Sequence, residues 1–244
     1  MIIEWVGCSG VGKSTLLDEV YKNLRSEGLD VCKPLDIFLG KTTSDIIANE
    51  RLQKLFLDIF ILPWSIISMA KHRHFFNYCL KSLNKGHFSF GRKVLLLRSI
   101  FRTLGLYFFL DNSSNKKRTI MLDEGTVQIA HLLFAHEEKT SVTKKEIESF
   151  CNHVPIPDLI VHIMAPKSEV ISRSLNRKDK PIVDPSPGAI KRFINLGHEI
   201  FEIINDLDPW TNKTITFFNS DQTNPQEALN ITNQIMDVQS SVKK

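Results

Sequence analysis

A glycine-rich string close to the N-terminus has the clearest chemical pattern in the chain. Residues 7–15 read GCSGVGKST and match the spacing GxxxxGK[ST] in full, between an apolar run and a helical apolar periodicity. In such a loop the glycines let amide N–H groups point at phosphate oxygens, the lysine reaches the β- and γ-phosphates, and the serine hydroxyl binds Mg²⁺. We therefore expect ATP and Mg²⁺ to bind at Gly7, Ser9, Gly10, Val11, Gly12, Lys13, Ser14 and Thr15, with Lys13 also catalytic.

Two acidic residues follow a second short apolar run. Residues 119–122 are predicted to form a strand that leads directly into Asp123 and Glu124. In a doubly wound sheet, ligands lie at the carboxyl ends of the strands. Asp123 is therefore predicted to hold Mg²⁺ together with Ser14 or to accept a proton, and Glu124 is a second catalytic candidate. Asp-Glu-Gly is also ordinary turn chemistry, and that interpretation stays open.

A basic stretch follows the fourth predicted strand. Arg173 and Arg177 are four residues apart, so on a helix both would point the same way. Two guanidinium groups on one face suit the charge of a transferring phosphoryl group. Residues 170–188 are therefore predicted to form a lid over the phosphate loop. The alternative is a solvated basic face.

Short apolar runs alternate with helical patterns along the chain, which predicts an α/β fold with a parallel sheet covered on both faces. The expected strands are residues 2–6, 29–35, 119–122, 159–164 and 214–218. Helices are expected after the phosphate loop and at residues 126–136, 167–180 in part, 190–207 and 225 onward, the last capped by Asn224.

A long helical insertion, about residues 45–110, separates the second and third strands, with interruptions near Pro63 and residues 85–86. Its end, residues 94–110, is strongly apolar, but it is short for a membrane span and contains Arg98 and Arg102. We expect this segment to be buried or to face a partner, such as a second copy of the chain, and expect no transmembrane segment. Contact with a membrane surface is the alternative.

The composition is typical of a globular protein and limits the kinds of ligand that it could bind. With 244 residues, 42% of them hydrophobic and 24% charged, residues 1–244 are expected to form one globular domain. The formal net charge of +4 suits a small anionic ligand, and no block of like charges suggests nucleic-acid binding. Four widely separated cysteines, without a leader pattern, favour reduced thiols in a cytoplasmic protein. The histidines, including His72, His74, His131 and His136, lack metal-ligand spacing and are expected at the surface or in packing.

The chain resembles the thymidylate-kinase-like group of P-loop kinases, which includes nucleoside and nucleotide kinases. The likeness rests on GCSGVGKST, the strand-end Asp123-Glu124, the string RSLNRKDK at 173–180, and the closing strand TITFFNSD before a helix that starts with proline. It implies a three-layer fold with strand order 2-3-1-4-5, a lid carrying Arg173 and Arg177, and an acceptor pocket lined by the inserted helices.

The chain departs from that group at two positions that serve the nucleoside acceptor. Val6 stands where the group has a carboxylate, and Gly125 follows the strand-three acids where the group has an arginine beside the acid. Groups that could replace them are Asp36, as a general base, and the arginines Arg92, Arg98 and Arg102 for an anionic acceptor.

Three functions fit these patterns. The first is an ATP-dependent phosphotransferase that acts on a small-molecule acceptor. The second is an ATPase that drives or regulates a partner, since an apolar strand that ends in Asp-Glu is usual in motor-type ATPases. The third is a nucleotide-binding interaction module without turnover. The basic stretch favours the first, because a closing lid excludes water from the γ-phosphate.

Overall fold

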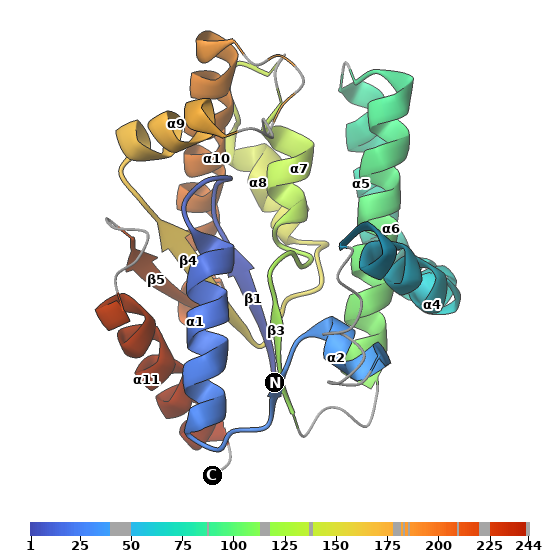
Figure 1. Ribbon diagram of the computed structural model, residues 1–244. Coiled ribbons are helices and arrows are strands. Elements are labelled where there is room, and N and C mark those ends of the chain that lie inside the picture. The colour runs from blue at the N-terminus through green and yellow to red at the C-terminus, as the bar shows by residue number, and fades with distance from the viewer. Residues whose placement is uncertain are drawn as a thin grey trace.

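The computed structural model describes residues 1–39, 50–86, 88–112, 118–136, 139–177, 182, 184, 186–208, 210–219 and 225–242 (Figure 1). Its centre is a five-stranded sheet in which every pair of neighbouring strands is parallel. The strands are β1 (Ile2–Val6), β2 (Val31–Cys32), β3 (Thr119–Leu122), β4 (Leu159–Met164) and β5 (Thr214–Phe218). Their order is β2-β3-β1-β4-β5, so the predicted α/β architecture and strand order are confirmed.

The middle of the sheet is buried on both faces. All five residues of β1 are buried, and Ile3 is in register with Met121 of β3 and Leu159 of β4. Helices α1 (Lys13–Ser26) and α11 (Pro225–Val242) lie side by side over one face, and α10 (Pro187–Asn205) lies behind the other (Figure 1). This arrangement explains why the strands read as continuous apolar runs.

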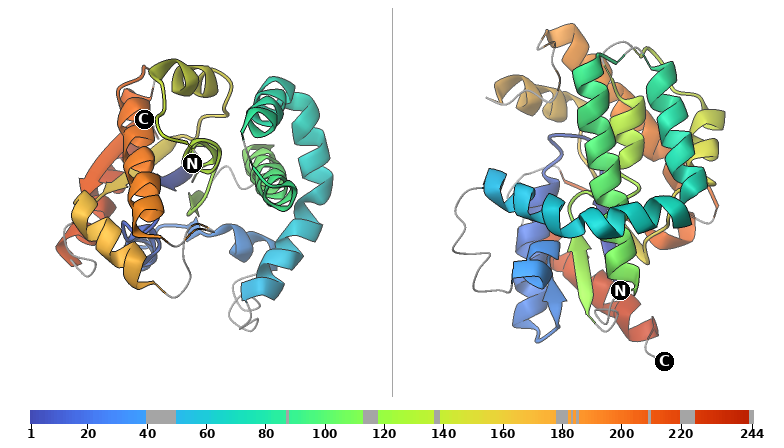
Figure 2. Two further views of the ribbon diagram at one scale, coloured as in Figure 1. Left: turned by 90° about the horizontal axis from the view of Figure 1, so that it is seen from above. Right: turned by 90° about the vertical axis from the view of Figure 1, so that its right-hand side faces the viewer.

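The inserted helices form an arm beside the β2–β3 edge of the sheet (Figures 1 and 2). They are α2 (Pro34–Leu39), α4 (Glu50–Lys71), α5 (Arg73–Lys85) and α6 (Phe90–Asn112), and α4 crosses α6 (Figure 2, right). At the crossing the Ser68 hydroxyl donates to the Leu104 carbonyl at 2.9 Å. A Cβ at Gly105 would lie 2.1 Å from the Ser65 hydroxyl, so the crossing needs a residue without a side chain.

The apolar segment 94–110 belongs to α6 and is explained by packing. Its Leu96, Ile100, Leu104, Leu106 and Leu110 are buried. No helix in the described part of the chain is long and apolar enough to cross a membrane. The start of the segment is exposed, at Val94 and Leu95, and further exposed apolar side chains lie on α4, at Ile59, Phe60, Leu62, Ile66 and Ile67.

Several predicted boundaries were wrong. The second strand ends at Cys32, because Pro34 starts α2, where proline needs no hydrogen-bonded N–H. Pro63 does not interrupt α4, which runs on to Lys71. The helix predicted at 126–136 is α7, Ile129–Phe134.

Two α-helices in the described part of the chain were missed, α2 and α8. Helix α8 (Lys144–Cys151) begins with a capping box in which Thr143 and Glu146 bond to each other's backbone N–H groups. The start of α11 at Pro225 is confirmed, whereas the predicted cap Asn224 lies outside the described residues.

Candidate functional site

The glycine-rich string folds as an open loop between β1 and α1. Gly7, Gly10 and Gly12 have φ angles of 143°, 93° and 92°, which residues with a side chain rarely adopt. A Cβ at Gly7 would also lie 2.4 Å from the Ile163 carbonyl oxygen. Because α1 starts at Lys13, the N–H groups of its first turn have no partner within the helix and form a place for an anion.

Lys13 bridges the two ends of this loop. Its ammonium donates to the carbonyl oxygens of Gly7 at 2.9 Å and Cys8 at 3.2 Å. Removal from water lowers the pKa of Lys13 from its usual value, and the carboxylate of Asp123 opposes that effect. The ammonium of Lys13 therefore lies against the start of the loop, and Asp123 is the acid that acts most strongly on its charge.

Ser14 and Asp123 meet although 109 residues separate them. The Ser14 hydroxyl donates to Asp123 Oδ2 at 2.8 Å. The other carboxylate oxygen, Oδ1, is buried and has no hydrogen-bond partner within the described residues. A hydroxyl and a carboxylate are oxygen ligands of the kind that Mg²⁺ prefers, so the donor set fits this ion.

The phosphate loop and the acid pair line one cavity of about 630 Å³. Its wall on the opposite side comes from α9 (Lys167–Asn176) and the residue that follows. The lining residues are Ser9, Gly10, Gly12, Lys13, Ser14, Thr15, Asp123, Glu124, Arg173, Asn176 and Arg177. Most of the predicted site residues are thus brought together, and three basic side chains face two acidic ones.

The two arginines reach this cavity differently from the prediction. Arg173 lies on α9 and pairs with Glu169 at 2.8 Å. Arg177 follows the end of that helix in an extended conformation and donates to the Ser9 hydroxyl at 3.3 Å. The argument from helical spacing was therefore wrong, yet both residues line the cavity. Much of the rest of the predicted lid, including 178–181, lies outside the described residues.

The sequence of this chain matches no protein-family model and no curated protein. Its function has to be inferred from the chemistry of these residues.

A buried network behind the loop was not predicted. Gln128 accepts from the N–H of Gly7 at 3.3 Å and donates to the Gly7 carbonyl at 3.2 Å. The N–H of Gln128 donates to the carboxylate of Glu4 at 2.8 Å, and Thr126 also donates to that carboxylate, at 3.4 Å. Glu4 on β1 thus holds the segment that follows the acid pair, and this segment holds the first glycine of the loop.

Glu4 is fully buried at the centre of the sheet. Burial raises the pKa of its carboxyl from 4.5 to about 7, although hydrogen bonds from the N–H groups of Gln128, Val127 and Gly125 favour the charged form. A Cβ at Gly125 would lie 2.4 Å from the carboxyl group. The glycine after the acid pair is therefore required by this carboxyl, which is a physical reason for the Asp-Glu-Gly string.

Asn219 supports the loop from the end of β5. Its side-chain amide donates to the Val11 carbonyl at 2.8 Å, and its backbone N–H donates to the Met164 carbonyl at 2.7 Å. A Cβ at Gly12 would lie 2.5 Å from the same amide nitrogen. The sequence carried a signal for this contact, because Asn219 is a polar residue directly after the apolar strand β5.

The structure does not bring the substitute acceptor groups to this cavity. Asp36 lies on α2, where it accepts from the Tyr21 hydroxyl and the Lys33 N–H, each at 2.9 Å. Arg98 and Arg102 both pair with Asp58 and so join α6 to α4. Neither these residues nor Arg92 line the phosphate-loop cavity.

His131 takes the packing role that the sequence predicted. It is buried between Phe193 and Phe201, with ring centroids 4.8 and 6.0 Å away. Two further buried histidines, His162 and His198, lie in the same part of the core. Burial lowers the pKa of all three, to about 3 for His131 and His162, so they are neutral at pH 7.

Proposed function

We propose that this protein is a phosphotransferase that moves the γ-phosphoryl group of ATP, with Mg²⁺, to a small-molecule acceptor. The observation that carries the proposal is the 2.8 Å contact between Ser14 and Asp123 beside Lys13. It joins a hydroxyl, a carboxylate and an ammonium at a loop whose three glycines all have positive φ angles and which lines the cavity. These are the groups that hold a Mg²⁺-bound triphosphate in phosphoryl-transfer sites.

Each group has a role that follows from its charge. The loop amides and Lys13 would hold the β- and γ-phosphates, and Ser14 and Asp123 would hold the metal. When bound, Mg²⁺ neutralises charge that develops on the phosphate oxygens. Arg173 and Arg177 face the same cavity from the opposite wall, where guanidinium groups would stabilise the transferring group.

The proposal is tested by phosphate transfer from γ-labelled ATP to a pool of acceptors that includes nucleosides, nucleoside monophosphates and other hydroxyl-bearing metabolites. We expect label transfer that depends on both Mg²⁺ and the acceptor pool. Lys13→Ala should reduce the rate by roughly two orders of magnitude or more, a typical loss for one preorganised charged group. Lys22→Ala, on the exposed face of α1, is the matched control and should leave the rate unchanged.

An ATPase is the second candidate, and Glu124 is the observation that favours it. Glu124 lines the same cavity as Lys13 and follows directly after the acid that would hold the metal. There it would polarise a water molecule for attack on the γ-phosphate. Strong hydrolysis without an acceptor, abolished by Glu124→Gln, would establish the ATPase and reject the phosphotransferase.

A further inference from the structure

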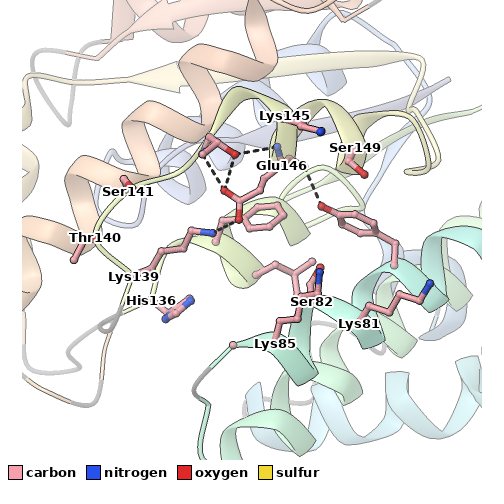
Figure 3. A pocket seen from close by; sticks show the side chains of 15 residues that line it. Lys81, Ser82, Lys85, His136, Lys139, Thr140, Ser141, Lys145, Glu146 and Ser149 are labelled. Atoms are coloured by element: carbon pink, nitrogen blue, oxygen red, sulfur yellow. Dashed lines mark hydrogen bonds and ion pairs between the residues drawn. The ribbon is translucent and has the colours of Figure 1, made fainter.

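A second cavity, of about 590 Å³, opens between α5 and the segment that runs from α7 to α8 (Figure 3). This volume is in the range of cavities that bind small molecules. Tyr78, Lys81, Ser82 and Lys85 of α5 form one wall. The other wall comes from Leu133, Phe134 and His136, and from residues between Lys139 and Ser149. In the described part of the chain, no residue lines both this cavity and the phosphate-loop cavity.

Positive charge dominates the described lining of this cavity. It contains four lysines, Lys81, Lys85, Lys139 and Lys145, and one carboxylate, Glu146. Lys139 neutralises that carboxylate through an ion pair of 2.6 Å (Figure 3). Within the described residues the other three lysines form no ion pair. Lys81 and Lys85 are four residues apart on α5 and therefore lie on the same side of that helix, while Lys145 comes from α8.

The walls of the cavity are fixed to each other. The Tyr78 hydroxyl on α5 donates to the Glu146 carbonyl on α8 at 2.9 Å. The Glu146 carboxylate accepts from the N–H and the hydroxyl of Thr143, both at 2.9 Å, and closes the capping box. Beneath this contact the rings of Phe75 and Phe150 pack with centroids 5.5 Å apart. A cavity held in this way loses little entropy when a ligand enters.

The lining chemistry selects the kind of ligand. Ammonium groups only donate hydrogen bonds, so the ligand must bring acceptors and negative charge. Besides Thr143, whose hydroxyl belongs to the capping box, four residues of the lining carry hydroxyl groups that could bind hydroxyls of a ligand. They are Ser82, Thr140, Ser141 and Ser149. The rings of Tyr78 and Phe134 are less available for stacking on a ligand. Tyr78 stacks on His153 at 5.7 Å, and the Lys139 ammonium lies over Phe134 at 5.1 Å. This lining suits a phosphorylated, hydroxyl-rich molecule better than a planar base.

We propose that this cavity is a second ligand site, which binds the phosphate ester of a small hydroxylated metabolite through Lys81, Lys85 and Lys145. Exposed lysines on helices are usually only solvated. Here they come from two elements that are more than 50 residues apart in the sequence, and they surround a cavity of ligand size. The only carboxylate of the described lining is already paired, so it does not cancel their charge. The proposal does not depend on turnover at the phosphate loop.

The test uses glycerol 3-phosphate and inorganic phosphate as probes, in isothermal titration calorimetry at about 0.15 M ionic strength, where distant charges are screened. Every protein carries Lys13→Ala, which weakens phosphate binding by the glycine-rich loop. The cavity variant adds Lys81→Ala, Lys85→Ala and Lys145→Ala. The matched control removes three exposed lysines outside the cavity, Lys22, Lys144 and Lys191, so both proteins lose the same charge.

We expect glycerol 3-phosphate to bind the parent protein more tightly than inorganic phosphate does. The cavity variant should bind it at least roughly tenfold more weakly, and the control should change it less than about twofold. Alanine is the best helix former, so both variants should fold, which thermal unfolding verifies. Equal weakening in the two variants would show a general charge effect and overturn the proposal. Absence of binding to the parent protein would overturn it as well.

Discussion

Gln128 holds Gly7 by both backbone groups: it accepts from the Gly7 N–H at 3.3 Å and donates to the Gly7 carbonyl at 3.2 Å. The same carbonyl accepts from the Lys13 ammonium at 2.9 Å. The segment after the acid pair and the first glycine of the phosphate loop are therefore one hydrogen-bonded unit. This unit links the segment after β3, which carries Asp123, to the loop that leads into α1, which carries Lys13.

Gln128→Leu tests this relationship. The Gly7 N–H would lose its Gln128 partner, whereas the Gly7 carbonyl would keep its bond from Lys13. A buried polar group without a partner costs about 1–3 kcal/mol. We expect the free energy of unfolding, measured in urea, to fall by about 1–3 kcal/mol, and the affinity for Mg²⁺-ATP to fall with it. Gln128→Glu keeps an acceptor for the Gly7 N–H but sets a buried carboxyl oxygen against the Gly7 carbonyl, so it should also destabilise the protein. An unchanged free energy of unfolding in Gln128→Leu would contradict the pairing.

Asp123→Asn separates metal binding from phosphate binding. Asparagine can still accept from Ser14, but it lacks the negative charge that attracts Mg²⁺. We expect the gain in ATP affinity on adding Mg²⁺ to fall at least roughly tenfold, the equivalent of about 1.4 kcal/mol. The affinity measured with EDTA should stay the same or rise, because a charge that repels phosphate is gone. Asp30→Asn, at a residue outside this cavity, is the control. An unchanged Mg²⁺ effect would remove Asp123 from the metal site.

Glu4 should make the protein less stable as the pH rises. The pKa of its carboxyl is about 7 in the folded chain, against 4.5 for an exposed glutamate. Between these two pH values the folded state therefore binds the proton more strongly than the unfolded state does. This contribution to stability is fully present below pH 4.5 and is lost as the pH rises through about 7. Glu4→Gln stays neutral, so the difference in free energy of unfolding between variant and parent should shift in favour of the variant from pH 5 to pH 8. A difference independent of pH would contradict a buried, titrating carboxyl.

The buried histidines have the opposite effect on stability from Glu4, because they make the protein less stable as the pH falls. The pKa values of His131 and His162 are about 3 in the folded protein against 6.5 when exposed, and that of His198 is also lowered. Below pH 6.5 the unfolded chain takes up protons that the folded chain does not, so stability falls as the pH falls. Each such group contributes up to about 1.4 kcal/mol per pH unit. His131→Leu should therefore reduce the loss in free energy of unfolding between pH 6 and pH 4, measured in urea. An equal loss in variant and parent would contradict a neutral, buried His131.

Replacing two helical glycines, Gly197 and Gly91, with alanine should have opposite effects on the stability of the protein. A Cβ at Gly197 of α10 would lie 2.8 Å from both Cys8 Sγ and His131 Nε2, while nothing lies within 4 Å of one at Gly91 of α6. Overpacking costs about 1–3 kcal/mol, whereas alanine in an open helical position gains up to about 1 kcal/mol. Gly197→Ala should lower the melting temperature and Gly91→Ala should leave it equal or raise it. A stable Gly197→Ala protein would show that the loop has room to move.

The parts of the site that follow from local sequence were predictable, and those that depend on burial were not. GCSGVGKST predicted a glycine-rich loop between a strand and a helix because its spacing is set by one short turn. The position of Asp123 beside this loop was predictable because strand ends meet at one edge of a parallel sheet. Glu4 was missed inside the apolar string IIEWV, although an acid in a buried strand must have partners, and that signal was available. Arg177 was placed on a helix that ends one residue earlier, since no local pattern marks that end.

Cys8 sits within the phosphate loop but is buried, and burial raises the pKa of its thiol to about 12. The reactive thiolate is therefore absent at neutral pH, and electrophiles cannot reach the sulfur while α10 covers it. Alkylation of Cys8 would require the loop to separate from α10. The rate of that labelling would consequently report how often the glycine-rich loop separates from α10, and ligands that hold the two together should slow the reaction.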